Sequence, residues 1–329
     1  MAADWTRRSV LVTGAGGFIG SHLAERLVTL GARTKALVRY NSSNSWGWLD
    51  SSAAKDSVEI ILGDVRDRNT VENAMRGVDT VFHLAALIAI PYSYRAPMSY
   101  VQTNVEGTLN VLHEALGAEV QMMVHTSTSE VYGTAQYVPI DEKHVLQGQS
   151  PYSASKIAAD MMAEAYHRSF GLPVATVRPF NCYGPRQSAR AIIPTIISQA
   201  LKETCLRLGN LEPTRDLNFV ADTVEGFILA AECKDAVGQV MNLGTGQEIS
   251  VKELAGTILR VLGKDLPMES ENQRQRPGKS EVFRLCADSR KARQILGWQP
   301  QHTLEQGLRK TIDWMERNID VYKSNVYVI

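Results

Sequence analysis

Three side chains in the middle of the sequence could together carry out proton transfer. Tyr152 and Lys156 are four residues apart, and Glu130 ends the triplet Thr128-Ser129-Glu130 upstream of them. The dipeptide Ser150-Pro151 predicts a helix start, so Tyr152 and Lys156 lie on one face of that helix. A nearby cation and the positive end of a helix dipole both favour ionisation of a phenol, whose pKa is ordinarily about 10. The pattern predicts a phenolic general base beside a second base, a carboxylate.

A glycine-rich turn near the N-terminus could bind a dinucleotide. The apolar run at residues 10–13 leads into the turn at residues 14–20, and apolar residues then recur at helical spacing until Gly31. Glycines permit a tight turn and the close approach of a pyrophosphate, which the unpaired N–H groups at the helix start can bind. The candidate cofactor contacts are Gly14, Gly17, Phe18, Ile19 and Gly20.

The composition argues against several classes of protein. The chain has 329 residues and equal numbers of basic and acidic side chains, so no electrostatic footprint for nucleic acid or an anionic membrane is visible. The apolar stretch at residues 82–90 is too short to span a bilayer, and residues 1–8 lack the apolar core of a signal peptide. The four cysteines are widely spaced, without metal-ligand pairing. We expect a cytoplasmic enzyme with no metal site and no nucleic-acid or membrane partner.

Short β-branched runs alternate with helical patterns through the first half of the chain. The expected strands are residues 10–13, 35–38, 58–62, 80–83, 122–125 and 174–177. Such alternation is typical of an α/β fold with a doubly wound parallel sheet. We therefore expect a dinucleotide-binding Rossmann domain over residues 1–180, which residues 216–245 rejoin.

The rhythm changes after about residue 180. Helical patterns are expected at residues 192–201, 223–231 and 254–262, the last preceded by a capping box at Ser250 and Glu253. A final helix opens at Thr303. We expect a smaller α/β substrate-binding lobe, made of residues 181–215 and 246–329, that packs closely on the first domain.

Together these motifs resemble the extended short-chain dehydrogenase/reductase family over nearly the whole chain. Further segments that carry the resemblance are residues 63–65, 83–86, 104–108, 178–186, 215–220 and 296–300. The resemblance implies a nicotinamide cofactor and a nucleotide-sugar substrate. It also implies a homodimer formed through helices near residues 105–116 and 154–166.

The resemblance assigns further residues to the two ligands. Besides the glycine turn, Tyr152 and Lys156, the implied cofactor contacts are Asp64, Val65, Leu84, Ala85, Ala86 and Pro179. The implied substrate contacts are Ile88, Asn181, Arg190, Arg215 and Arg276. The arginines suit a diphosphate, because a guanidinium can bind phosphate through two parallel hydrogen bonds.

Glu130 distinguishes two reactions within the family. A 4-epimerase removes a hydride from C4 and returns it to the other face, whereas a 4,6-dehydratase must also take the C5 proton and expel the C6 hydroxyl. The triplet resembles that of the dehydratases, in which Glu130 would lie beside C5 and C6 while Thr128 shares a proton with O4. Its middle residue is Ser129 rather than Asp, as in dehydratases of GDP-mannose and of nucleotide-linked N-acetylhexosamines, which makes dTDP-glucose a less favoured substrate.

Two segments, residues 37–48 and 184–194, most resemble N-acetylhexosamine dehydratases of bacterial nonulosonic-acid pathways. We therefore expect a UDP-N-acetylglucosamine 4,6-dehydratase. The alternatives are a dehydratase of a GDP-linked sugar and a nucleotide-sugar 4-epimerase. A nucleotide-sensing module without catalysis is disfavoured, since it would not need both Tyr152 and Lys156.

The choice of cofactor depends on Arg39. NAD sites usually place an acidic residue after the second strand, where it binds both ribose hydroxyls, and Arg39 occupies that region here. A cation favours the 2′-phosphate of NADP, tightly bound and regenerated in each turnover. The alternative is NAD, with its ribose held by the backbone and by Asn41 or Ser42.

Overall fold

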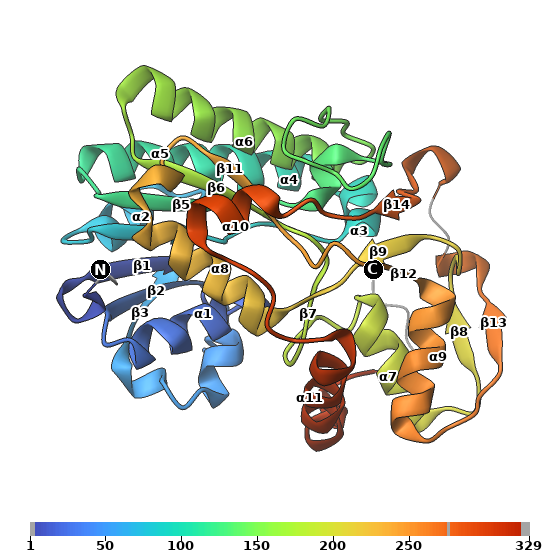
Figure 1. Ribbon diagram of the computed structural model, residues 1–329. Coiled ribbons are helices and arrows are strands. Elements are labelled where there is room, and N and C mark those ends of the chain that lie inside the picture. The colour runs from blue at the N-terminus through green and yellow to red at the C-terminus, as the bar shows by residue number, and fades with distance from the viewer. Residues whose placement is uncertain (1–3, 275–276, 324–329) are drawn as a thin grey trace.

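Seven parallel strands form the centre of the protein (Figure 1). The computed structural model describes residues 4–274 and 277–323. The strands lie in the order β11-β6-β5-β4-β1-β2-β3, and every neighbouring pair is parallel. Their bounds are β1 (Ser9–Thr13), β2 (Arg33–Arg39), β3 (Val58–Gly63), β4 (Thr80–His83), β5 (Met122–Thr126), β6 (Val174–Pro179) and β11 (Val240–Leu243). The predicted doubly wound parallel sheet is confirmed.

All six expected strands are present, and each begins within two residues of its predicted start. The seventh, β11, was not expected. It has only four residues, and its buried Asn242 interrupts the apolar pattern. Strand β11 lies within residues 216–245, the stretch that we expected to rejoin the first domain, and it pairs with β6. The division of the chain into two lobes stays a prediction.

Helices cover both faces of the sheet, so its inner strands β1, β4, β5 and β6 are buried on both sides. Leu11 of β1 joins the core cluster under α2, α5 and α6, whereas Val10 and Val12 join the cluster that faces α1 and α8. Burial on both faces explains why these strands are nearly continuous apolar runs. The helices of this part are α1 (Phe18–Thr29), α2 (Arg68–Met75), α3 (Ile90–Arg95), α4 (Pro97–Tyr100), the π-helix η4 (Val101–Glu106), α5 (Gly107–Gly117), α6 (Pro151–Phe170) and α8 (Val220–Glu232).

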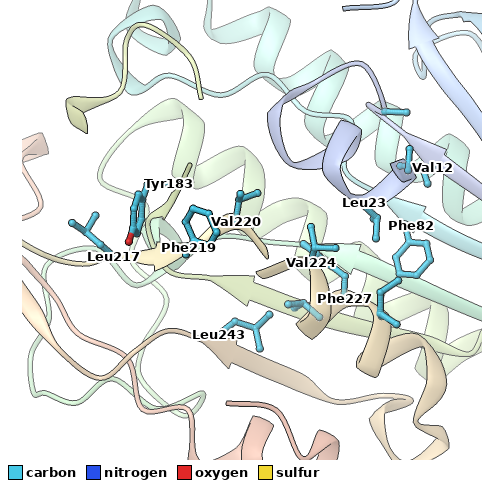
Figure 2. Packing of buried hydrophobic residues seen from close by; sticks show 14 of the residues in the cluster. Val12, Leu23, Phe82, Tyr183, Leu217, Phe219, Val220, Val224, Phe227 and Leu243 are labelled. Carbon is cyan, nitrogen blue, oxygen red and sulfur yellow. The ribbon is translucent and has the colours of Figure 1, made fainter. Parts of the chain in front are cut away.

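The core on the α1 and α8 side continues into the rest of the molecule. Figure 2 shows Leu23 of α1 and Phe227 of α8 near Phe82 of β4. Phe219 and Tyr183 extend the same cluster away from the sheet. The cluster also includes buried residues of α7, α9 and α11, so the two parts of the chain share one core.

Short strands and four further helices complete the structure. The helices are α7 (Ile192–Lys202), α9 (Val251–Leu262), α10 (Arg290–Leu296) and α11 (Leu304–Arg317). The strands are β7 (Cys182–Tyr183), β8 (Leu206–Leu208), β9 (Thr214–Asp216), β10 (Asn218–Phe219), β12 (Glu248–Ser250), β13 (Met268–Ser270) and β14 (Arg284–Leu285). None of these strands was predicted, because two or three residues cannot display a period of two.

Three predicted helix starts are confirmed by their caps. Ser150 caps α6 and Pro151 occupies its first turn. Ser250 and Glu253 form the expected capping box of α9. Thr303 caps α11 in the same way. In each box a side chain accepts from a backbone N–H that the helix itself leaves unpaired.

The sheet order also determines where a ligand can bind. The chain leaves β1 toward β2 and β3, and then crosses to the other side of β1 for β4, β5 and β6. In such sheets, ligands bind outside the carboxyl ends of the strands where the order reverses. Gly14, Leu84 and Ser127 directly follow β1, β4 and β5, so the predicted motifs meet at this edge.

Candidate active site

Close backbone contacts shape the glycine turn. Gly14 has a φ of +71°, and a Cβ there would lie 2.8 Å from the Ala85 nitrogen. A Cβ on Gly20 would lie 2.3 Å from the Gly14 oxygen. Gly17 precedes α1 and offers no side chain to cap its first N–H groups. This glycine turn fits a pyrophosphate, because unpaired backbone N–H groups and the positive end of the helix dipole would face a bound anion.

Thr13 joins the glycine turn to the segment after β4. Its hydroxyl oxygen accepts from the N–H groups of Leu84 and Ala85, each at 3.1 Å, and its proton points to His83 Nδ1 at 2.8 Å. The other ring nitrogen, Nε2, donates to Thr108 Oγ1 at 2.9 Å, because the Thr108 proton is used on a backbone carbonyl. Burial lowers the pKa of His83, which is therefore neutral. The proposed cofactor contacts Leu84 and Ala85 are thus tied to β1.

Arg39 is the exposed cation at the end of β2. Its side chain is 73% exposed, and its Nε lies 3.9 Å from Asp64 Oδ2. Asp64 is bound more closely by Arg66, through contacts of 2.9 and 2.6 Å. Those hydrogen bonds lower the pKa of Asp64 and outweigh its partial burial. The Asp64 carboxylate is therefore largely occupied, whereas Arg39 faces solvent.

Asn41 is fully engaged by its own loop. Its Oδ1 accepts from the N–H groups of Ser43 and Ser45, each at 3.1 Å, and its Nδ2 donates to the Ser45 carbonyl at 2.7 Å. The expectation that Asn41 holds a ribose is not supported by this geometry, because local bonds use its amide. The loop instead closes on the glycine turn, where the Trp48 N–H donates to the Gly16 carbonyl at 3.0 Å.

Two remaining cofactor candidates are buried and the third is half-buried. Val65 packs against α5, where a Cβ on Gly107 would lie 2.7 Å from its Cγ2. Pro179 ends β6, in register with Leu243 of β11. Ala86 is half-buried in the segment after β4. All three lie near the carboxyl edge of the sheet or on the segments that leave it.

The predicted phenolic base, Tyr152, and its neighbour Lys156 lie at the start of α6. Tyr152 and Lys156 are both buried on the same side of the helix, as the four-residue spacing predicts. The Thr128 side chain lies close enough to the Tyr152 phenol to lower its pKa. The Lys156 Nζ donates to the Thr126 carbonyl at the end of β5, at 2.7 Å. Residues from β5, the following turn and α6 therefore converge.

The pKa of Tyr152 does not follow the sequence-based expectation. Burial raises it above its ordinary value, the hydrogen bond from Thr128 lowers it only in part, and the charge of Glu130 raises it further. The expected lowering of the Tyr152 pKa is wrong for the protein by itself, because desolvation of the phenolate dominates. Burial also lowers the pKa of Lys156 to about 8, although Asp160 opposes that change.

A short 3₁₀-helix, η5 (Ser129–Tyr132), places the acidic residue. Thr128 caps it by accepting from the Glu130 N–H at 3.2 Å. Ser129 is buried, and Glu130 is half-buried and close enough for its charge to act on Tyr152. The structure therefore brings Thr128 and Glu130 of the predicted triplet to the phenol.

A buried carboxylate behind this site was missed from the sequence. Asp160 accepts hydrogen bonds from His125 Nε2 at 3.0 Å, from Ser127 Oγ at 2.6 Å and from Arg178 at 3.0 and 3.2 Å. Burial alone would raise its pKa, but the bond from His125 and the charge of Arg178 lower it to about 2. The available signal was spacing, since Asp160 follows Lys156 by four residues on the same helix.

The expected substrate residues are spread over both parts of the chain. Ile88 is 52% exposed at the edge of the sheet. Asn181 has a buried Oδ1 for which the described residues provide no hydrogen-bond partner, as expected of an atom that binds a ligand. Arg190 is exposed, and its charge acts on the buried Tyr100.

The other two arginines expected to bind substrate are Arg215 and Arg276. Arg215 lies in β9 with 11% of its side chain exposed, and its Nη2 is 3.6 Å from Glu281 Oε1. Its Nη1 donates to the Thr214 carbonyl at 2.9 Å. Arg276 lies outside the described residues.

No helix within residues 4–274 and 277–323 is both long enough and apolar enough to cross a membrane. Over the same residues, no group of three or more His, Cys, Asp or Glu side chains could hold a metal ion.

Known proteins resemble the chain over nearly its full length. Residues 11–311 match the family model described as GDP-mannose 4,6 dehydratase. The UDP-glucose 4-epimerase of Mycolicibacterium smegmatis is 36% identical over 310 residues, which are 92% of this chain and 97% of that protein. A solved structure of DesIV, a dTDP-glucose 4,6-dehydratase from Streptomyces venezuelae with NAD bound, has a TM-score of 0.86 and 31% identity. That match covers 96% of this chain and 99% of the other.

A longer relative matches only in part. A trifunctional UDP-glucose 4,6-dehydratase/UDP-4-keto-6-deoxy-D-glucose 3,5-epimerase/UDP-4-keto-L-rhamnose-reductase from Arabidopsis thaliana is 32% identical over 326 residues. This chain spans 48% of that protein's length. Both dehydratases and epimerases are thus among the proteins that the chain resembles.

Proposed function

Because the chain belongs to the GDP-mannose 4,6-dehydratase family of extended short-chain dehydrogenases/reductases, we propose that it is a nucleotide-sugar 4,6-dehydratase acting on UDP-N-acetylglucosamine. The position of Glu130 supports this proposal most: Thr128 accepts a hydrogen bond from its N–H at 3.2 Å, and Glu130 is close enough for its charge to act on the Tyr152 phenol. A phenol and a carboxylate thus share one side of the site. An epimerase needs the phenol alone, whereas elimination of water needs both.

The residues of this chain divide the proton transfers between them. Tyr152 takes the O4 proton, and Thr128 lies beside the phenol. Glu130 takes the proton from C5, which a ketone at C4 makes acidic, and the resulting carboxylic acid protonates the departing C6 oxygen. Elimination leaves a double bond between C5 and C6. Return of the C4 hydride to C6 and uptake of a solvent proton at C5 then balance the reaction, so the sugar has lost one water and become a 4-keto-6-deoxy sugar.

The glycine turn, Leu84 and Ala85 would hold the nicotinamide cofactor. When bound, this group accepts and returns a hydride, and its oxidised ring brings a positive charge toward the phenol, which favours the phenolate. Lys156 adds a second positive charge beneath β5. These two charges oppose the effect of burial on the pKa of Tyr152.

We favour NADP over NAD because of Arg39. A 2′-phosphate needs a cation at the end of β2, and the Arg39 side chain extends there into solvent. The competing acceptor for a ribose hydroxyl, Asp64, is bound by Arg66. A GDP-linked sugar as substrate remains the alternative to the UDP sugar.

A homodimer and a cytoplasmic location also stay predictions. Support for the dimer comes from exposed apolar side chains on and beside the helices expected to pair. These are Met98 and Val101, which precede α5, and Met161 and Met162 on α6. Exposed apolar groups gathered on adjacent helices favour burial by a partner.

The reaction can be tested with purified protein and a panel of nucleotide sugars in heavy water. A dehydratase yields a product that has lost one water and carries deuterium at C5, visible by mass spectrometry. An epimerase yields a product with all its oxygens. The second result, with any sugar of the panel, would replace the dehydratase by its alternative.

Glu130→Gln tests the role that separates the two reactions. Gln has nearly the same shape but cannot accept the C5 proton, so oxidation at C4 should proceed and elimination should stop. Reduced nicotinamide should accumulate after substrate is added, which near-ultraviolet absorbance measures. The exposed Glu72→Gln on α2 is the matched control and should turn over normally. Dehydration at the wild-type rate by Glu130→Gln would remove the main support for the proposal.

A further inference from the structure

The segment after β4 is held in two separate halves. Its first half, Leu84 and Ala85, is bound by Thr13 of β1. Its second half ends at Ala89, whose φ of +78° is rare for a residue with a side chain. Such a conformation persists only where surrounding contacts enforce it. Ile88, half exposed, lies directly before this strained residue.

Tyr100 supplies the contact that enforces the conformation. It ends α4, is fully buried, and its hydroxyl donates to the Ala89 carbonyl at 2.7 Å. The hydroxyl also contacts the carbonyl of Ile88. Burial raises the pKa of Tyr100 to about 12, so the phenol keeps its proton and stays a donor at neutral pH.

The same ring touches the proposed base. The rings of Tyr100 and Tyr152 meet edge to face, with centroids 6.2 Å apart and an angle of 75°. This arrangement is favourable for two aromatic rings. Tyr100 therefore lies between the strained segment and the phenol, in contact with each.

Asn104, four residues after Tyr100, forms a second link between the segment after β4 and the start of α6. Its side chain accepts from the Leu87 N–H at 2.7 Å and donates to the Leu87 carbonyl at 3.0 Å. It also donates to Ser155 Oγ at 2.9 Å, and Ser155 in turn donates to the Tyr152 carbonyl at 2.7 Å. Asn104 belongs to the π-helix η4, an irregularity that is frequent at functional sites.

We propose that Tyr100 is a positioning residue that holds the backbone of Ile88 and Ala89 at a set distance from the Tyr152 phenol, and so orients the hexose of a nucleotide sugar for deprotonation at O4. The inference rests on the proposed use of Tyr152 as the base. It applies equally to dehydration and epimerisation, since both begin at O4. The cofactor half of the segment is bound by Thr13 and is independent of Tyr100.

Tyr100→Phe is the decisive variant, because it keeps the ring and removes only the hydroxyl. We expect KM for the nucleotide sugar to rise about three- to tenfold, the usual effect of one lost hydrogen bond. Cofactor affinity, measured by fluorescence titration, should stay within about twofold of the wild-type value, which is the size of the experimental error. Tyr92→Phe on α3 is the control, since its ring also approaches Tyr100 but is partly exposed. It should leave KM unchanged.

Two results would overturn the role of Tyr100. One is an unchanged KM in Tyr100→Phe. The other is a loss of cofactor affinity by the same factor as the rise in KM, together with a lower melting temperature. A residue with a merely structural role would produce that result. Calorimetric binding of UDP-N-acetylglucosamine to wild type and variant gives the same ratio without turnover. A wild-type protein that binds this sugar but converts no nucleotide sugar would defeat the proposed function, while the binding ratio still decides the role of Tyr100.

Discussion

The two walls of the candidate site depend on opposite properties of the chain. The wall formed by the glycine turn depends on missing side chains, because a Cβ on Gly14 or Gly20 would press on backbone atoms. The wall formed by η5 and α6 depends on side chains that are present and buried, above all Tyr152 and Lys156. An added methyl group therefore damages the first wall by steric clash, whereas the second wall can lose its chemistry and keep its fold.

Charge is also distributed differently between the two walls. Two buried cations, Lys156 and Arg178, and one buried carboxylate, Asp160, lie behind Tyr152. Burial lowers the pKa of the neighbouring His125, which leaves it neutral. The wall also carries Glu130 of η5, so two cations face two carboxylates, and the charge of Glu130 raises the pKa of Tyr152. The glycine turn has no charged side chain of its own and relies on backbone N–H groups.

The largest effect is expected when the second wall loses its phenol. Tyr152→Phe should fold and bind cofactor but lose roughly 10²–10⁴ in turnover rate, because no group then takes the O4 proton. Steady-state kinetics together with cofactor titration check both parts. Tyr166→Phe, further along α6, is the control and should behave as wild type. Near-normal turnover of Tyr152→Phe would show that the walls do not differ in this way.

An intermediate effect is expected when the first wall gains one methyl group. In Gly20→Ala the new Cβ would lie 2.3 Å from the Gly14 oxygen, so the turn must shift. Overpacking of this kind costs about 1–3 kcal/mol, or roughly 5- to 150-fold in cofactor affinity. Gly117→Ala is the matched control, because nothing lies within 4 Å of its Cβ position. Equal affinities of the two variants in a fluorescence titration would contradict the steric account.

The smallest effect is expected at the exposed rim of the cofactor wall. The Arg39 side chain is 73% exposed, so water screens its charge. Arg39→Ala should weaken NADP binding by about 1 kcal/mol, roughly fivefold, and leave NAD binding unchanged. Arg33→Ala, at the other end of β2, is the control. Equal losses for the two cofactors would show that Arg39 does not read the 2′-phosphate.

The fold was predictable because its signals are local and repeated. Six strands and the caps of three helices follow from apolar runs and from single side chains next to them in sequence. The short strands after residue 180 were not predictable, since β9 becomes a strand only through its neighbours β12 and β14. A segment of three residues carries too little pattern to specify its own structure.

The candidate site was predictable only where one helix or one turn carries it. The spacing of Tyr152 and Lys156 indicates a shared face, and the order of the glycines indicates a turn. The ionisation state of Tyr152 was not predictable, because burial depends on all the elements packed around it. Nor was the engagement of Asn41, whose amide could equally have faced a ribose until the loop closed on itself.

The parallel sheet, the glycine turn and the shared helix face of Tyr152 and Lys156 follow from local sequence patterns, because each depends on residues within a few positions of one another. The approach of Thr128 to Tyr152 and the hydrogen bond from Tyr100 to Ala89 arise only when the chain folds. Those contacts join separate segments, and their geometry comes from the way in which α4 and α6 pack along the sheet edge. Spacing along a chain specifies a face of a helix, but only packing specifies what that face touches.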